Sequence, residues 1–475
     1  MSKPEGKLSS MGIAGETIWG TPVAAADYLK FSSESLSLSI EDLISASLNG
    51  RRDEADSHEG LNTIAGETVH EVHPTGLGYF LRSFFGHPAT VAHGTSSYTH
   101  VFNPESGVLA ATRKGTATGG GATTLADTGK TWVSSEHIGR WVTIVGGVGK
   151  GQTRYITAND ATTLTVAAWV VQPTSASVYE INLGPKDCVT PPYTLEIHRS
   201  LGGATPAFQF AGNVVNQMAF SIGSSAKILQ LSNSWIGKLV ANIANTTPSM
   251  PTTVPFTWNQ MKFGFTRATT ATVDSGCTTT SIACSGSPGW TTNQYVGDIV
   301  FIKTGTGINQ ARVITANTAS ALTVGTLVTT PAAADTIEIF SAFDYTEQLG
   351  FTFNNGLVGV PLLNNSKYIG KIEGDAARTG LLSGTFEDSD IVNYGLYTGR
   401  TQTRGCIYFE GETITGAHKH RIFIDMPAIL INAYPINVSG GGKITVAVSA
   451  KLKYDTTDSR AYRVILDNAK ANYNL

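Results

Sequence analysis

The chain has 475 residues, which is enough for two to four compact units. Only 15% of the residues are charged, Gly reaches 51, and this composition favours sheets and turns over helical bundles or disorder. The net charge of −3 and the pI of about 6.4 argue against a dedicated nucleic-acid binder, which usually carries a basic patch.

Neither a membrane-spanning helix nor a secretory signal is expected. The longest apolar stretch, Ile422–Ile436, is interrupted by Asp and Pro and is shorter than the roughly 20 residues that a spanning helix needs. Residues 1–10 are polar, so we expect synthesis in a cytoplasm. The four cysteines show no metal-ligand spacing. Pairing of Cys277 with Cys284 stays open, although a reducing cytoplasm disfavours it.

The N-terminal elements begin with an alternating strand, Phe31–Ile40, which places Leu and Ile on one face and serines on the other. The stretch Asn49–Gly60 carries both signs of charge without an apolar anchor, and it is predicted to be a long loop. A second strand, Ile64–His73, leads into a helix, Thr75–Phe85. Pro74 opens this helix and its apolar residues recur at helical spacing, so one face is predicted to pack on a sheet.

Two segments further along the chain are copies of each other. Residues 131–166 align with residues 289–324 without a gap, at a constant offset of 158 positions, and self-similarity of this kind fixes the architecture. Each copy is interpreted as an inserted β domain of about 65 to 70 residues, a size that is only marginally stable alone. Two glycine-rich stretches in the first copy, Gly119–Gly121 and Gly146–Gly149, are predicted to be turns because neither leads from a strand into a helix.

The remaining chain is interpreted as a framework that is itself duplicated. Phe31–Ile40 has a counterpart in Glu347–Asn354, and the strand before the helix has one in Gly380–Asp390, with a short helix after Asp388. Further framework strands are predicted at Phe208–Ile222, Ile228–Trp235, Lys262–Phe265, Gln348–Phe353, Ile407–Glu410, Arg421–Ile424, Ile429–Tyr434 and Lys443–Tyr454. The expected division is framework at 1–110, 185–267 and 343–475, with inserted domains at 111–184 and 268–342.

No motif for catalysis, cofactor binding or metal binding stands out, so the chain is not expected to be an enzyme. His70-Glu71-Val72-His73 has the wrong spacing for a zinc site and lies on a predicted strand, where residues three apart point to opposite faces. His418-Lys419-His420 is predicted to lie in a solvated turn.

Glutamine and arginine recur at equivalent positions of the two copies. Two interpretations of these residues remain, a glycan-binding or surface-binding role and a structural hydrogen bond within each hairpin. The residues are Gln152, Arg154, Gln310 and Arg312.

The framework resembles the tail tube proteins of tailed bacteriophages. The resemblance covers roughly two thirds of the chain, and the two copies depart from it. The stretches that carry it are Ser33–Leu38 with Gly50–Asp53, Gly66–Leu81, Phe210–Ile222 with Trp235–Lys238, and the C-terminal third, with Phe353–Gly356, Gly384–Asp388, Ile422–Pro427, Leu452–Asp455 and Val464–Asn468.

The resemblance implies a mainly β, tail-tube-type β-sandwich framework with a flanking short helix and two tube-like units per chain. It implies a structural virion protein of the tail, whose self-associated rings stack into a hollow tube for genome ejection. The rings are trimeric with pseudo-sixfold symmetry, or hexameric. The partners are other phage tail proteins and phage DNA, which passes without sequence-specific binding.

Ring closure between copies would also pair edge strands that are an aggregation hazard on a lone chain. The polar loop is the candidate contact between rings, through Arg51, Arg52, Asp53 and Glu54. The alternatives are a capsid decoration or other virion accessory protein, and a carbohydrate-binding adhesin built on the repeated module.

Overall fold

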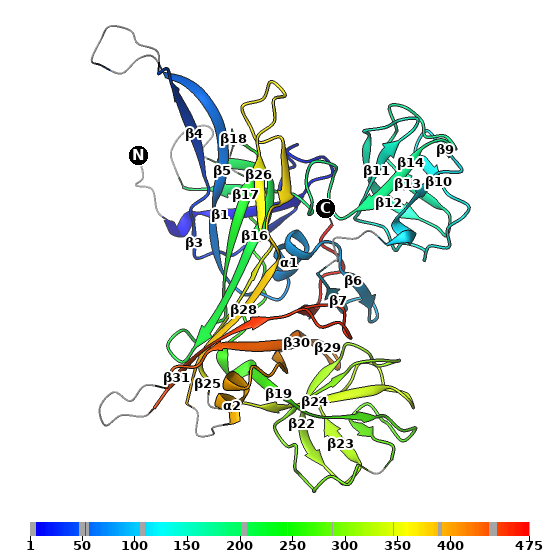
Figure 1. Cartoon of the computed structure of the whole chain (residues 1–475), viewed down its shortest axis with the longest axis vertical. Helices are drawn as coiled ribbons and strands as arrows, with labels where there is room; N and C mark the ends of the chain where they lie inside the picture. Colours follow the sequence, from blue (N-terminus) through cyan, green and yellow to red (C-terminus); the bar gives the residue numbers. More distant parts are fainter. Residues whose placement is uncertain are drawn as a thin grey trace.

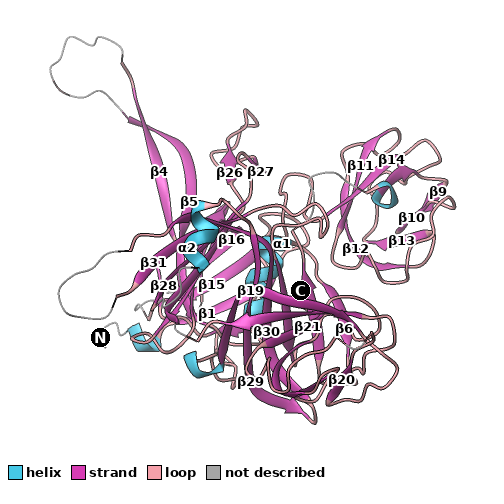
Figure 2. Ribbon diagram, turned by 60° about the horizontal axis from the view of Figure 1, so that its bottom comes forward, coloured by secondary structure: helices cyan, strands magenta, loops and turns pink. Residues whose placement is uncertain are grey.

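The computed structural model is built mainly from strands, and two α-helices occur in the described part of the chain, so the prediction of a mainly β fold is confirmed (Figure 1, Figure 2). The structure describes residues 6–46, 53, 57–104, 110–200, 207–244, 246–286, 288–344, 346–387, 392–436 and 444–474.

Strand β16, Ala207–Gly223, is a long strand that belongs to two sheets in turn. Its first half pairs with β15, Tyr193–His198, on one edge and with β18, Leu239–Ile243, on the other. Its second half pairs with β17, Gln230–Gly237, and with β25, Thr346–Asn354. Gly212 adopts a φ of 74° at the change of partners, a conformation that a side chain disfavours. The sequence predicted β16 and β17 to within two residues.

Strand β30, His418–Ala433, has the same two-part pairing in the C-terminal third. Strand β29, Thr403–Thr415, follows one edge, while β32, Arg463–Asn468, and β31, Val446–Leu452, share the other. The prediction of two strands here, divided near Pro427, was wrong. The strand runs through because Pro427 lies where the pairing with β29 is irregular, so no ladder hydrogen bond is lost there.

The N-terminal strands form a long hairpin, with β4 at Ser37–Ile44 and β5 at Ser57–Glu71. Strand β3, Ser33–Glu34, pairs with the other end of β5, so the predicted strand Phe31–Ile40 is divided in two. Part of the predicted loop at 49–60 is also wrong, because Ser57 to Gly60 belong to β5, and Ser57, His58 and Glu59 lie opposite residues of β4.

Helix α1, Leu77–Phe85, confirms the predicted helix, and its residues are buried on all sides rather than on one face. Phe80 packs edge-on against Trp235 of β17, and Phe84 lies against Phe353 of β25. Helix α2, Val392–Thr398, follows β28, Thr379–Phe386, as α1 follows β5. The other framework strands are β1 Ser10–Gly15, β2 Asp27–Leu29, β6 Ala89–Ala92, β7 Tyr98–Phe102, β26 Leu357–Val360 and β27 Lys371–Gly374.

The first copy of the repeat, here called repeat segment 1 (residues 114–182), forms a seven-stranded sheet around its own apolar core. Gly119–Gly121 was predicted to be a turn and is instead a strand, because it pairs with β10 along one edge. The strands are β8 Lys114–Thr116, β9 Gly119–Gly121, β10 Thr124–Ala126, β11 Trp141–Gly146, β12 Thr153–Asn159, β13 Thr163–Val166 and β14 Val178–Asn182.

The second copy, repeat segment 2 (residues 270–342), pairs its strands in the same order. The expected domain boundary between residues 267 and 268 falls inside β19, because this strand pairs first with β29 and then with β24. The strands are β19 Met261–Thr272, β20 Ser281–Ala283, β21 Ile299–Ile302, β22 Ala311–Asn317, β23 Ala321–Val324 and β24 Thr336–Ala342.

A buried asparagine fastens the same loop in each repeat segment. Asn317 accepts a hydrogen bond from the Tyr295 N–H at 2.8 Å and donates to the Thr291 carbonyl at 2.8 Å. Asn159 makes the equivalent bonds with His137 and Val133. The side chain therefore replaces secondary structure in a loop that has no strand partner.

We predict that Asn317→Ala lowers the local free energy of unfolding of repeat segment 2 by about 2 kcal/mol, because buried backbone groups lose their partner. Hydrogen exchange of β22 and β23 measures the change. Thr315→Ala, which removes an exposed hydrogen bond to the Thr323 carbonyl, is the control and should change exchange by roughly 0.5 kcal/mol or less. Equal effects of the two substitutions would contradict the role of Asn317.

Candidate assembly surfaces

The framework contains a continuous run of eight strands. Within the described residues, the outer edge of β4 is open at one end of the run, and the outer edge of β30 is open at the other end beyond Ile429, where its pairing with β29 stops. The order of the run is β4, β5, β17, β16, β25, β28, β31 and β30, and each strand pairs antiparallel with the next. We call this run the long sheet (Figure 1). Edge strands present unpaired backbone groups, so its two ends are candidate contacts with other chains.

The middle of the long sheet is the pairing of β16 with β25, here called the internal joint. It extends from Gln217 opposite Asn354 to Gly223 opposite Gln348. Phe220 stacks on Phe351 across the joint, with ring centroids 4.5 Å apart. Burial of large aromatic side chains on this scale is worth several kcal/mol, so the joint is a strong contact between distant parts of the chain.

The strands on either side of the internal joint follow the same order of pairing. On the N-terminal side, β16 has β15 and then β1 on one edge, while its other edge has β18 and the series β17, β5 and β4. On the C-terminal side, β30 has β29 and then β19, and its other edge has β32 and the series β31, β28 and β25. The two sides of the joint therefore repeat one order of strand pairing.

The predicted inter-ring residues fall between β4 and β5 in the sequence. Asp53 is exposed, whereas Arg51, Arg52 and Glu54 lie outside the described residues. The two strands project from the body of the framework, and β4 is exposed along its whole length (Figure 1). The base of β5 contacts the loop between β26 and β27, through the Asn62 N–H and the Lys367 carbonyl at 2.7 Å.

Repeat segment 2 joins the framework through an apolar centre. Phe301 of β21 stacks on Phe423 of β30, with ring centroids 4.5 Å apart. Ile299 and Phe340 of the segment belong to the same buried cluster as Tyr408 of β29. This contact buries one face of the segment against β29 and β30.

A buried network of charged residues borders that apolar centre. Asp425 of β30 accepts hydrogen bonds from Arg404, Arg460 and Arg463 at 2.9 to 3.0 Å. Arg404 Nε also lies 2.7 Å from Glu338 of repeat segment 2, as an ion pair without hydrogen-bond alignment. Sequence reasoning missed this network, because its members are scattered over distant strands and no local spacing marks them.

Glu410 of β29 lies on the opposite border of the same contact. Its carboxylate accepts hydrogen bonds from Lys419, from the Tyr408 hydroxyl at 2.7 Å and from Arg421 at 3.0 Å. Burial by itself raises the pKa of Glu410, but these hydrogen bonds and the Arg421 charge lower it to about 2.

Repeat segment 1 is attached more lightly. The Trp141 indole N–H donates to the Thr17 carbonyl at 2.8 Å, and Arg82 of α1 donates to the Gly139 carbonyl at 3.2 Å. Its apolar core contains no framework residue, in contrast to the shared cluster of repeat segment 2. Figure 1 accordingly shows it at the side of the molecule.

The recurrent glutamine and arginine residues bind the main chain of their own segments. Gln152 donates to the Val171 carbonyl at 2.7 Å, and Gln310 donates to the Thr329 carbonyl at 2.8 Å. Arg154 and Arg312 each donate to a carbonyl fourteen residues later, that of Ala168 or Thr326. These contacts favour the structural interpretation over glycan binding.

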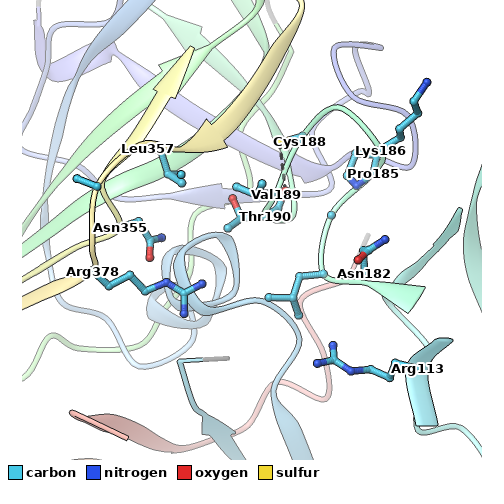
Figure 3. Close-up of a pocket in the computed structure, with 14 residues that line it drawn as sticks. Arg113, Asn182, Pro185, Lys186, Cys188, Val189, Thr190, Asn355, Leu357 and Arg378 are labelled. Carbon is cyan, nitrogen blue, oxygen red and sulfur yellow. Dashed lines mark hydrogen bonds between the residues drawn. The ribbon is translucent and has the colours of Figure 1, made fainter. Parts of the chain in front are cut away.

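A pocket of about 430 Å³ lies where the chain leaving repeat segment 1 passes β26 and β27 (Figure 3). Arg113, Lys186 and Arg378 line it, and none of its lining residues is Asp, Glu or His. The Cys188 thiol donates to the Thr190 carbonyl, and burial raises the pKa of this thiol above its ordinary range. A protonated thiol is a poor nucleophile, so the pocket holds no activated group.

The histidines of the HExH motif bind separate backbone carbonyls. His70 Nδ1 lies 2.8 Å from the Lys30 carbonyl, and His73 Nδ1 lies 2.6 Å from the Thr253 carbonyl. Burial lowers the pKa of His70 to about 4, so its ring is neutral and donates from Nδ1. No group of three or more His, Cys, Asp or Glu side chains in the described ranges is arranged to hold a metal ion.

Two smaller expectations meet different outcomes. His418 and His420 belong to the first residues of β30 rather than to the predicted turn, which is confined to Gly416 and Ala417. Cys277 and Cys284 are both free thiols in the structure. Within the described residues, no helix is long and apolar enough to cross a bilayer.

We predict that the Glu410 contacts stabilise the fold by up to about 3 kcal/mol at neutral pH, given a folded pKa of about 2 and an unfolded value of 4.5. Because the folded pKa is the lower one, this stability is present above pH 4.5 and is lost as the pH falls towards 2. Denaturant unfolding of the wild type and of Glu410→Gln should therefore differ at pH 7 and converge near pH 2. A gap that is independent of pH would contradict this account.

The family comparison agrees with this architecture. Residues 6–287 match the family described as phage tail tube protein, and this span covers more than half of the chain. It begins before β1, includes repeat segment 1 and ends within repeat segment 2. A comparison with curated proteins gives no match. The chain therefore belongs to the phage tail tube protein family and is a structural protein of the virion tail.

Proposed function

We propose that the chain is the subunit of stacked rings that form the tail tube, through which the genome is ejected into the host. The observation that carries this proposal is the long sheet, which has an open stretch of strand edge at each end, within the described residues, and a buried joint in its middle. Closure into a ring removes both edges, and this is the general solution for sheets that would otherwise aggregate.

Each chain supplies two related tube units to the ring in this proposal. The repeated order of strand pairing and the position of a helix after β5 and after β28 support two units. Three chains then give a ring with pseudo-sixfold symmetry. The net charge of −3 suits a channel in which DNA moves without being retained, because a strongly basic lining would bind phosphates.

The β4–β5 hairpin makes the contact between successive rings. The hairpin projects from the framework (Figure 1), and the four charged residues lie between its two strands in the sequence. Arg51 and Arg52 meet acidic groups of the neighbouring ring in this arrangement, and Asp53 and Glu54 meet basic ones.

The two repeat segments are inserted domains that hang on the outer surface of the tube. The ends of repeat segment 1 are adjacent, since Thr116 of β8 lies opposite Val178 of β14. Repeat segment 2 leaves and returns in the same way, with Thr272 of β19 opposite Thr336 of β24. Domains attached by neighbouring strands are add-ons that leave the path of the framework chain unchanged.

Electron microscopy of the purified chain tests the tube directly, and we predict long hollow tubes of stacked rings. Arg51→Glu with Arg52→Glu should leave single rings but shorten or abolish tubes. Lys114→Glu with Lys150→Glu makes the same charge change on exposed residues of repeat segment 1 and should leave tube length unchanged. A chain that persists as a monomer and coats capsids would instead identify a decoration protein.

Replacing residues 117–177 by Asn-Gly should leave tube assembly intact and narrow the tube. Asn-Gly closes a two-residue hairpin between Thr116 and Val178, which already face each other. Tube diameter and yield in electron micrographs are the measurements. Loss of rings from a variant whose framework still unfolds cooperatively would place this segment within the ring contact rather than outside it.

A further inference from the structure

The internal joint offers a template for the contact between copies, because the two ends of the long sheet correspond to its two sides. This inference rests on the proposed function. β16 and β30 can be aligned residue by residue, because each strand has one irregularity in its pairing with the next strand of the long sheet. The irregularity lies between Val215 and Gln217 in β16 and between Ile431 and Ala433 in β30. Gln217 therefore corresponds to Ala433. The correspondence holds further along, since Phe220 opposite Leu231 matches the bridge of Ile436 with Val446.

One edge of β16 has two successive strand neighbours, whereas the corresponding edge of β30 has only the first of them among the described residues. On β16 this edge is taken first by β15 and then by β25. On β30 the same edge is taken by β29 only as far as Ile429, which lies opposite Thr403. Beyond that point β29 does not continue along this edge, within the described part of the chain. The missing neighbour corresponds to β25.

The strand that corresponds to β25 is the β3–β4 pair at the other end of the long sheet. β25 pairs with β28, and the β3–β4 pair lies beside β5. Each of these two neighbours, β28 and β5, is followed by a helix. The registers place Ser39 at the position of Asn354 and Leu38 at the position of Phe353. The outer edge of β4 is therefore the second half of a joint whose first half is on β30.

Side-chain exposure distinguishes the open edges from the internal joint. Phe220 is 4% exposed and Phe353 is fully buried in the joint. Their counterparts at the open edges, Ile436 and Leu38, are 50% and 37% exposed. Leu36 and Tyr434, at the other two apolar positions of the open edges, are already buried in the lone chain. Leu38 and Ile436 are thus the apolar side chains that remain in water, which favours a partner strand at the open edges.

We propose that residues 433–436 of one copy pair antiparallel with residues 36–39 of a second copy, with the register of the internal joint. Ala433 lies opposite Ser39, Tyr434 opposite Leu38, and Ile436 opposite Leu36. The pairing continues the long sheet from copy to copy and buries Leu38 and Ile436 between them.

The backbone directions agree with this register. The Asn355 N–H donates to the Asn216 carbonyl at 2.8 Å, so the backbone hydrogen bonds of the internal joint are made by the even-numbered residues of β16. Gln217 and Asn354 are therefore opposite each other without a hydrogen bond between them, as a non-bonded pair. On the open strand, the Ser35 N–H donates to the Glu67 carbonyl of β5, so Leu36 and Leu38 direct their backbone groups outward. Pro435, which has no N–H, falls opposite Ser37 at a non-bonded position, where this joint needs no donor.

A charged pair covers part of the open edge in the lone chain. The Leu36 N–H donates to a Glu34 carboxylate oxygen at 3.1 Å, and Arg199 donates to the Leu36 carbonyl at 2.5 Å. Arg199 also binds Glu34 through two hydrogen bonds of 2.7 and 2.9 Å. In the internal joint, Leu349 occupies the position that corresponds to Glu34. The Glu34–Arg199 cap is therefore present only at the open edge, where a second copy has to bind. Charged residues at a strand edge protect it from unwanted pairing.

Disulfide cross-linking in assembled tubes tests the register. Cysteines in Ser39→Cys/Ala433→Cys face each other across a non-bonded pair, which suits a disulfide, and we expect covalent multimers on a non-reducing gel. Within one copy the two sites are separated by the width of an eight-stranded sheet, roughly 33 Å, so a link must join two copies. Either single variant should stay monomeric. Gln217→Cys/Asn354→Cys is the matched control, and it should link within one chain and keep the monomer mass.

Leu38→Pro gives a second test that does not depend on cysteine chemistry. The substitution removes a backbone N–H that points away from β5, and every hydrogen bond to β5 is kept. The chain should therefore fold with an unchanged unfolding midpoint, but it should form no rings. Tubes that form with free thiols at positions 39 and 433, or normal rings from Leu38→Pro, would overturn the register and leave the proposed function standing. Failure of the unmodified chain to form any ring would overturn both.

Discussion

The pairing of β16 with β25 is the interaction on which the rest of the structure depends. It joins two sheets that each have their own helix, and it turns them into one run of eight strands. Residues 217–223 and 348–354 lie far apart in the sequence, so pairing them costs more chain entropy than pairing neighbouring strands does. Its aromatic stack fixes the register, because a slip of one residue would turn Phe220 and Phe351 away from the core.

The two repeat segments show how one module is fitted to two positions. Their internal bonds are the same, as the Gln, Arg and Asn contacts demonstrate, but their contacts with the framework differ. Phe301 of segment 2 stacks on the framework, whereas the equivalent residue of segment 1 is Thr143, which hydrogen-bonds within its own sheet. Segment 2 shares a buried apolar cluster with the framework, whereas segment 1 is attached by the hydrogen bonds of Trp141 and Arg82. The strength of attachment is therefore set by a few residues on one face of the module.

Much of the fold follows from local patterns in the sequence. The constant offset of 158 residues identifies the repeat segments, and the predicted strand Phe208–Ile222 matches β16. Local patterns fail where pairing decides the outcome. Gly119–Gly121 is a strand only because β10 lies beside it, and Pro427 is tolerated only because the ladder is irregular there. The network around Asp425 and the cap formed by Glu34 and Arg199 join residues that no spacing links, so only the folded chain brings them together.

The number of chains in one ring most directly tests the proposal that each chain supplies two tube units. Mass measurement of single rings, combined with rotational analysis of end-on electron micrographs, gives this number. The account predicts three chains and true threefold symmetry, with six similar inner lobes and outer density that departs from sixfold symmetry. A ring of six chains with strict sixfold symmetry would contradict it, because twelve tube units would then line the channel.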